Sequence, residues 1–240
     1  TPLEKGVLLH STLENLWQQL QCQKKLVELD EKNKLLVLIE ETIDSTLSSL
    51  KKKKPYTFQS LFTQLEKNRL KRTVAKYLTQ EMQRTPFQIY KLEYQTDFQI
   101  GSATLSLRID RIDQTEDGNL VAIDYKTGQT SISEWFEDRL LEPQLPMYAL
   151  SEQNISSLLY AQLHQRAIQN KGLTNEATMT SSTIHDIAKY DIQWEEQKKV
   201  WYEKISSLLR EFLVGNTRPT PHKKNLCDRC QYSNLCGLNR

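Results

Sequence analysis

The feature that most constrains the fold of this chain is a pair of strand-like segments on either side of an Asp-Gly dipeptide. In ATLSLRIDRID (103–113) apolar and polar residues alternate, which is typical of a half-buried β-strand. Asp117-Gly118 follows, a dipeptide that favours a tight hairpin turn. The apolar segment LVAIDYK (120–126) then forms the returning strand. The sequence therefore predicts an antiparallel hairpin in the middle of the chain.

This predicted hairpin brings two carboxylates together. Folding about residue 117 sets Asp110 opposite Asp124, and a two-residue turn shifts the pairing by one position. Either way the side chains are close neighbours, with Cβ atoms about 5 Å apart when directly paired, where like charges repel. A divalent cation such as Mg²⁺ turns that repulsion into ligation. Lys126 projects from the same strand face as Asp124, because it follows two residues later.

This constellation suits phosphodiester hydrolysis. A metal held there polarises a phosphoryl oxygen and acidifies a bound water, and the amine orients the water or stabilises the charge of the transition state. The alternative is a surface hairpin with ordinary charged residues and a Lys-Asp pair. Arg111 and Asp113 point to the opposite strand face from Asp110, so we do not expect them to be catalytic.

The 240 residues favour one large domain, or one domain with an appendage. We expect an α/β fold with a mixed central sheet flanked by helices and an N-terminal helical region. Apolar spacing predicts helices over 1–20, 24–50, 58–83 and 191–214, with Gly215 ending the last. Residues 155–163 fit a strand or a buried helix, and the polar residues 168–185 are predicted to be a loop. The expected organisation is a helical region (1–84), a catalytic sheet core (85–165), a loop and long helix (166–215) and a Cys-bearing tail (216–240).

Composition and net charge give little information about which molecules this chain binds. The net charge of +2 and the pI of 8.2 do not by themselves indicate a nucleic-acid-binding protein. No apolar run is long enough for a membrane span. Positive charge gathers instead in short clusters, which fit either a solvated surface or a phosphate-binding patch. These clusters are Lys51 to Lys54 and the group Lys67, Arg69, Lys71, Arg72 and Lys76.

Three of the four cysteines lie near the C-terminus. Cys227, Cys230 and Cys236 have the spacing C-x2-C-x5-C, and thiolates two residues apart can share a zinc ion or an iron-sulfur cluster. A secreted disulfide framework spreads its cysteines through the chain, so this distribution favours a reducing, cytoplasmic location. Cys22, the fourth, is interpreted as a small structural or surface residue.

The segments RIDRID, GNLVAIDYKTG and EPQLPMYAL resemble the RecB-type branch of the PD-(D/E)XK nucleases, especially the C-terminal nuclease domains of AddB-like helicase-nucleases. The resemblance implies a restriction-endonuclease-like fold and an Mg²⁺- or Mn²⁺-dependent deoxyribonuclease. It implies that Asp110, Asp124 and Lys126 are catalytic. It also implies that His10, in the family's Gly-x-x-x-His element, binds the metal together with Asp110 and Asp124. Gln144 and Tyr148 form a Gln-x-x-x-Tyr element and, with Glu93, are expected to support the site or contact DNA.

The resemblance also implies partners. We expect DNA strands or ends as substrate, exonuclease action in repair or recombination, and further domains or a helicase partner in a longer parent protein. The cysteine triplet resembles one that binds a [4Fe-4S] cluster, whose fourth ligand precedes the Gly-x-x-x-His element, so we expect the cluster to be incomplete in this chain. Two alternatives remain, a catalytically silent nuclease-like DNA-binding scaffold and an interaction module stabilised by its cysteine tail.

Overall fold

The computed structural model describes residues 2–53, 60–164, 167–216, 218–221, 225–228 and 230–236. Four helices come first: α1 (Pro2–Leu20), α2 (Gln23–Glu31), α3 (Leu35–Lys53) and α4 (Ser60–Glu81). They are followed by the strands β1 (Phe87–Ile100), β2 (Ala103–Thr115) and β3 (Leu120–Lys126). The 3-10 turn η1 (Ile132–Trp135) and helix α5 (Gln144–Ser151) connect β3 to β4 (Ile155–His164).

The remaining elements complete the sheet and its second helical face. They are β5 (Ala167–Thr174), η2 (Ala177–Met179), β6 (Ile184–Asp186), η3 (Ile187–Tyr190), α6 (Trp194–Leu213), α7 (Asn225–Asp228) and α8 (Ser233–Cys236). Gly215 follows α6 with a φ of +74°, as expected for a glycine that ends a helix. None of the described helices is long and apolar enough to cross a membrane.

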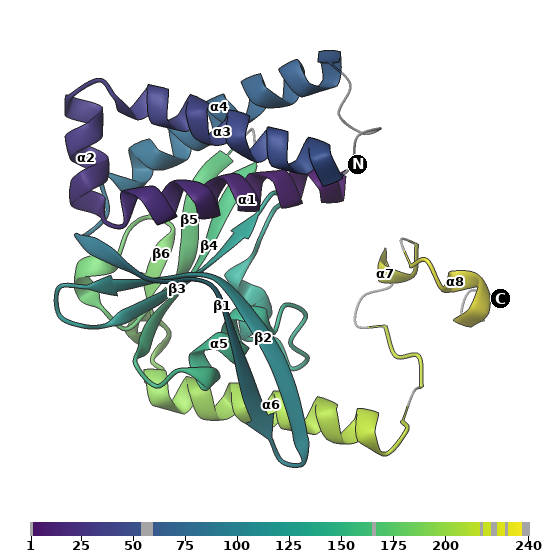
Figure 1. Cartoon of the computed structure of the whole chain (residues 1–240). Coiled ribbons are helices and arrows are strands. Elements are labelled where there is room, and N and C mark those ends of the chain that lie inside the picture. Colours follow the sequence, from purple (N-terminus) through teal and green to yellow (C-terminus); the bar gives the residue numbers. More distant parts are fainter. Residues whose placement is uncertain are drawn as a thin grey trace.

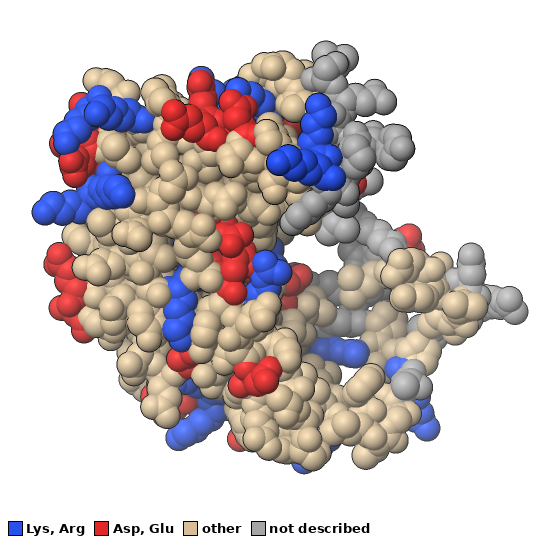
Figure 2. Space-filling model, in the orientation of Figure 1, with Lys and Arg blue, Asp and Glu red and all other residues tan. Residues whose placement is uncertain are grey.

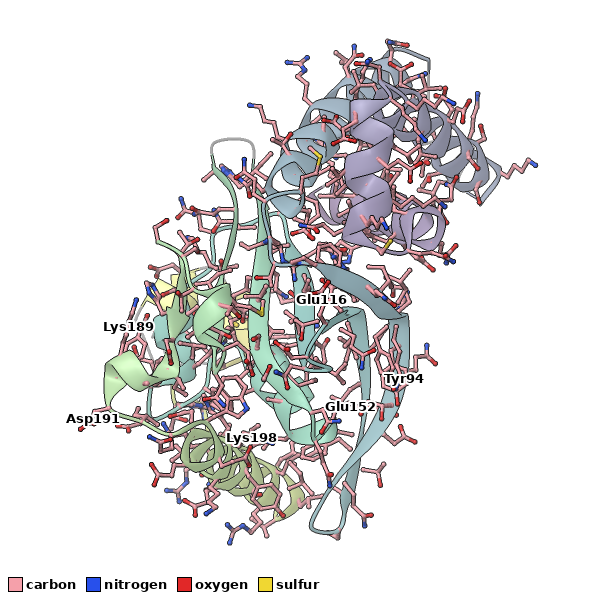
Figure 3. All side chains as sticks on the ribbon, turned by 90° about the vertical axis from the view of Figure 1, so that its left-hand side faces the viewer. Tyr94, Glu116, Glu152, Lys189, Asp191 and Lys198 are labelled. Atoms are coloured by element: carbon pink, nitrogen blue, oxygen red, sulfur yellow. The ribbon has the colours of Figure 1, made fainter. Side chains whose placement is uncertain are left out.

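The six strands form one mixed sheet in the order β1-β2-β3-β4-β5-β6. The pairs β1–β2, β2–β3 and β4–β5 are antiparallel, whereas β3–β4 and β5–β6 are parallel. Helices α1 to α4 cover one face of this sheet, and α5 and α6 cover the other (Figures 1 and 3). The predicted α/β class, with a mixed sheet between helices, is therefore confirmed.

Each face of the sheet has its own hydrophobic core. On β3, Val121, Ile123 and Tyr125 face the core formed with α1, α3 and α4, while Leu120 and Ala122 face the core formed with α5 and α6. A strand covered on both faces is apolar at successive positions, and β4 is likewise buried from Ile155 to Leu163. This burial on both faces explains why 155–163 lacks the alternation of a half-buried strand, and the segment is a strand and not a helix.

Two sequence predictions about secondary structure are wrong. The region 24–50 is not one helix, because a turn around Asn33, with a φ of +56°, separates α2 from α3. The region 168–185 is not a loop but contains most of β5 and most of β6. Its polar residues belong to a strand because they have buried partners: Asn170, for example, donates a 2.8 Å hydrogen bond to Glu81 of α4.

Candidate active site

The hairpin of β2 and β3 has the predicted register. Arg111 pairs with Ile123 and Asp113 with Val121, so Asp110 continues the same register opposite Asp124. The turn contains Gly118 at a φ of +83°, a left-handed conformation that favours glycine. Beyond the last paired residues, the backbone N–H of Tyr125 donates a 2.9 Å hydrogen bond to Oδ2 of Asp110. Both carboxylates are buried at this point, Asp124 almost completely.

His10 reaches the carboxylates from the helical layer. Its Nε2 lies 2.9 Å from the backbone carbonyl of Tyr125. A carbonyl only accepts hydrogen bonds, so Nε2 carries the proton, and Nδ1 of the neutral ring keeps its lone pair. Nδ1 lies 3.4 Å from Oδ2 of Asp110. Hydrogen bonding to a backbone carbonyl is how metal-binding histidines are commonly oriented.

The charges around His10 favour a positive partner. Burial lowers the pKa of His10, but the hydrogen bond to Asp110 and the negative charges of Asp110 and Asp124 outweigh burial and raise it above its usual value. The acidic surroundings thus stabilise a positive charge at the imidazole, and they would stabilise a divalent cation in the same way.

Glu93 of β1 joins the same group. Ligand atoms of His10, Glu93 and Asp110 all lie within 4.8 Å of one another. One imidazole nitrogen with carboxylate oxygens is a donor set that fits Mg²⁺ or Mn²⁺. Glu93 has a φ of +46°, inside a strand and without being glycine. Such strained backbone is uncommon and is concentrated at functional sites.

The grouping of His10, Glu93 and Asp110 gives Glu93 a larger part than the supporting role that we expected from the sequence. The missed signal is the Gly101-Ser102 turn, since Ile100 pairs with Ala103 and Tyr94 with Ile109. Counted from that turn, Glu93 lies opposite Asp110, just as Asp124 does on the other side of β2.

Asp124 and Lys126 form the next part of the site. Lys126 Nζ lies 2.8 Å from Oδ2 of Asp124 and donates a 2.9 Å hydrogen bond to Oε1 of Gln144 on α5. The Gln144 amide donates to the Tyr148 hydroxyl, which in turn donates to the backbone carbonyl of Arg108. This relay of Tyr148, Gln144 and Lys126 directs the amide oxygen, and not the amide nitrogen, toward the ammonium. Gln144 thus contacts the lysine directly, and Tyr148 contacts Gln144.

Asp124 is the most perturbed carboxyl of the site. Burial, followed by repulsion from Asp110, raises its pKa from 3.8 to about 6, although Lys126 and His10 act in the opposite direction. Glu93 is affected similarly: burial and the charge of Asp110 raise its pKa, while Arg108 opposes the shift. Negative charge is therefore in excess here, and a bound cation would relieve it.

The other face of β2 holds a separate set of charges, the ion network of Glu81, Arg84, Arg111 and Asp113. Arg111 binds Asp113 at 2.6 Å and Glu81 at 2.9 Å, and Arg84 binds the same two carboxylates at 2.8 and 2.7 Å. All four side chains are buried. As the sequence predicted, Arg111 and Asp113 lie away from Asp110.

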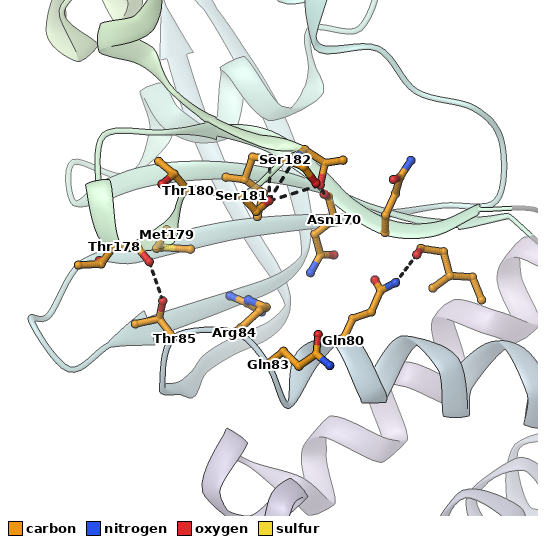
Figure 4. A pocket seen from close by; sticks show the side chains of 14 residues that line it. Gln80, Gln83, Arg84, Thr85, Asn170, Thr178, Met179, Thr180, Ser181 and Ser182 are labelled. Carbon is orange, nitrogen blue, oxygen red and sulfur yellow. Dashed lines mark hydrogen bonds between the residues drawn. The ribbon is translucent and has the colours of Figure 1, made fainter.

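Two other features lie away from these carboxylates. A pocket of about 450 Å³ is lined by hydroxyls and amides from the end of α4 and from residues 168–170 and 178–184 (Figure 4). None of the predicted site residues lines it. The tail cysteines are free thiols, with Cys227 half-buried and Cys230 and Cys236 exposed. Among the described residues, they do not form a group with metal-ligand spacing.

Three comparisons relate the chain to known proteins. Residues 1–237 match the sequence pattern of the PD-(D/E)XK nuclease superfamily. No curated protein matches the chain. A solved structure titled "Crystal structure of SSO0001" is 13% identical, with 93% of this chain and 85% of that chain covered and a TM-score of 0.33. The match over almost the whole length shows that the chain belongs to the PD-(D/E)XK nuclease superfamily.

Proposed function

We propose that this chain is a divalent-metal-dependent nuclease that hydrolyses phosphodiester bonds of DNA. The observation that carries the proposal is the convergence of His10, Glu93 and Asp110 beside the ion pair of Asp124 and Lys126. Membership of a nuclease superfamily supports it. We assign the metal to Mg²⁺ or Mn²⁺, because the donors are carboxylate oxygens with one imidazole.

In the proposed mechanism, His10 and Asp110 hold the metal with Asp124, Glu93 or both. When bound, the metal supplies Lewis-acid activation of the phosphoryl group and of a water. Lys126 positions the attacking water and stabilises negative charge on the phosphoryl oxygens. Gln144 accepts a hydrogen bond from the ammonium and keeps it directed into the site, toward the scissile phosphate. Tyr148 fixes the amide of Gln144.

The finer parts of the proposal rest on the resemblance to RecB-type and AddB-like domains. They are exonuclease action on strands or ends, a role in DNA repair or recombination, a helicase or further domains as partners, and a cytoplasmic location. Cys227, Cys230 and Cys236 are proposed to supply thiolates to an iron-sulfur cluster or zinc ion in the larger protein. Metal analysis of the longer parent protein, purified without oxygen, tests that assignment, and a parent protein without iron or zinc contradicts it.

The central experiment is a cleavage assay with DNA labelled separately at its 5′ and 3′ ends. Native protein with Mn²⁺ should degrade the DNA, whereas protein in EDTA and the Asp124→Ala variant should not. The position of the shortest labelled products separates end-dependent from internal cleavage. A native protein that binds DNA but leaves it intact with Mg²⁺ and Mn²⁺ contradicts the proposal and favours a catalytically silent scaffold.

A further inference from the structure

Helix α4 has two charged sides with different environments. On one side, its lysines pair with acidic residues of α3: Lys67 Nζ lies 2.7 Å from the Asp44 carboxylate, and Lys71 pairs with Glu40. These charges are balanced within the helical layer. Figure 2 shows the consequence on the face drawn there, where basic and acidic residues are interspersed.

The opposite side of α4 is cationic without such balance. Arg69, Arg72 and Lys76 are three and four residues apart, so they form one stripe along the helix. With Leu65, Thr73 and Ile168 they line a groove of about 280 Å³, hereafter the α4 groove. In the described part of the chain, no ion pair is recorded for Arg72 or Lys76, and both are exposed.

Arg69 has a fixed position at the wall of the α4 groove. Its Nε binds the buried Glu66 at 2.7 Å, and its buried Nη2 has no hydrogen-bond acceptor among the described residues. The exposed Arg72 and Lys76 therefore supply the positive charge that a ligand in the groove can reach.

The α4 groove lies at the same end of the strands as the candidate active site, on the face of the sheet that α4 covers, whereas Asp124 and Lys126 lie on the opposite face. Lys126 of β3 pairs with Gln162 of β4, which pairs with Gln169 of β5, next to Ile168 in the groove. Two strand spacings separate β3 from β5, or about 10 Å. The active site itself is rich in carboxylates, which repel a DNA backbone, so the cations that hold the DNA have to lie nearby and outside it.

We propose that the α4 groove binds backbone phosphates of the DNA strand whose scissile bond lies at the metal site. This inference rests on the proposed nuclease function. Arg72 offers guanidinium donors and Lys76 a point charge, so the contacts are independent of base sequence. The groove would hold the strand on one side of the cleavage point and leave chemistry to the carboxylates and Lys126.

The test compares two charge-matched double variants on the same helix. Arg72→Gln with Lys76→Gln removes two cations from the α4 groove, and Lys67→Gln with Lys71→Gln removes two from the balanced side. Both pairs are made in the Asp124→Ala chain, in EDTA, so that no DNA is cleaved. Fluorescence anisotropy then measures the Kd for a labelled single-stranded oligonucleotide over a series of NaCl concentrations.

For the groove variant, the slope of log affinity against log salt should fall by about 1.4, since each lost phosphate contact contributes about 0.7 on a single strand. Binding at 0.1 M salt should weaken by roughly tenfold or more. The Lys67 and Lys71 variant should keep the parental slope. Inorganic phosphate at millimolar concentration should compete only weakly, because a single phosphate lacks the neighbouring contacts of a strand.

Equal slopes for the two double variants, whether both changed or both unchanged, overturn the groove proposal. Its failure differs from failure of the nuclease proposal. A native chain that cleaves DNA while the two variants bind alike keeps its function and loses only the groove. A native chain that binds DNA through the groove without metal-dependent cleavage keeps the groove and loses the nuclease mechanism.

Discussion

Each face of strand β2 buries a group of charged side chains, and the two groups differ in whether their charges are balanced. On the face toward α4, two arginines and two carboxylates form the ion network of Glu81, Arg84, Arg111 and Asp113. On the other face, Glu93, Asp110 and Asp124 face mainly Lys126 and His10, with Arg108 at the rim. The first set is balanced by the protein itself. The second has too little positive charge to balance its carboxylates. Burial, followed by repulsion from Asp110, therefore raises the pKa of Asp124 to about 6.

The comparison shows that a buried carboxylate is not in itself evidence of a catalytic site. What distinguishes the two sets is whether the protein supplies the matching cations. In the network, the nearby arginines outweigh burial and hold the pKa of Glu81 below its usual value. At the candidate site, burial and the excess negative charge raise the pKa of Asp124, the negative charge outweighs burial and raises the pKa of His10, and an added cation would reduce the excess. Substitutions on the two faces should therefore change stability in opposite directions.

The largest expected effect is on the network. Arg111→Met leaves Glu81 and Asp113 buried with one guanidinium fewer, and should lower the free energy of unfolding by about 3–5 kcal/mol. Urea denaturation followed by circular dichroism measures it. Arg108→Met on the same strand is the control, because its side chain is 62% exposed, and its effect should stay within about 0.5 kcal/mol. Similar losses for both variants contradict the contrast between the faces.

Next comes the response to metal. Saturating Mn²⁺, at about 100 times its Kd, should stabilise the native chain by roughly 2.7 kcal/mol, or raise its Tm by about 5–10 °C. Asp124→Asn should lose most of this shift.

In EDTA at pH 7.5, the Asp124→Asn variant should be more stable than the native chain by on the order of 1 kcal/mol, because it removes an ionised buried carboxylate. Scanning calorimetry checks both, and a destabilised Asp124→Asn chain in EDTA argues against an excess of negative charge.

The third effect is on pH dependence. Since the pKa of Asp124 is raised to about 6, protons compete with the metal below that pH. Protonation of His10, whose pKa is also raised, acts in the same direction. At subsaturating Mn²⁺, kcat/KM should fall about tenfold between pH 6 and pH 5. In EDTA, stability depends on pH in the opposite direction to metal binding. The contribution of Asp124 to the free energy of unfolding is complete below pH 4 and is lost as pH rises through 6. Metal affinity that stays constant from pH 7 to pH 5 rules out this titration.

The smallest effect concerns the relay to Lys126. Tyr148→Phe removes the hydroxyl that binds the Gln144 amide and the Arg108 carbonyl. Freed from that hydroxyl, the amide can rotate, and we expect kcat to fall roughly 3- to 10-fold, equivalent to a hydrogen bond of about 1 kcal/mol. Tyr160→Phe is the control, since it also loses a buried hydrogen bond, from Trp135, but lies outside the relay. Equal changes in kcat for the two variants indicate general packing and not positioning.

Much of this arrangement could be predicted from the sequence because its signals are local. The turn at Gly118 determines the register of Asp110 and Asp124, and residue spacing puts Lys126 beside Asp124. Gln144 and Tyr148 came from the resemblance. His10 came only from the resemblance, since nothing near it in the chain indicates a contact with Tyr125, 115 residues away.

The wrong secondary-structure predictions have other causes. In the segment 168–185, the residues that decide the structure contact partners far away in the sequence. Asn170 and its neighbours looked like loop residues, yet Asn170 is buried in β5 by Glu81, 89 positions earlier. The place of Glu93 opposite Asp110 follows from the Gly101-Ser102 turn, but its left-handed backbone conformation has no signature in the residue types. The break between α2 and α3 at Asn33 is a single left-handed residue in an otherwise helical pattern.

The bond from His10 to the Tyr125 carbonyl joins the helical layer to the main chain of β3, and not to a replaceable side chain. No substitution at position 125 that keeps the strand removes the acceptor. A slide of α1 along its axis by one residue, a rise of 1.5 Å, would break this hydrogen bond, because the bond is only 2.9 Å long. Any molecule that shifts α1 against the sheet would therefore move the His10 imidazole relative to Asp110 and Glu93, so the geometry of the proposed metal site depends on how the N-terminal helices dock on the sheet.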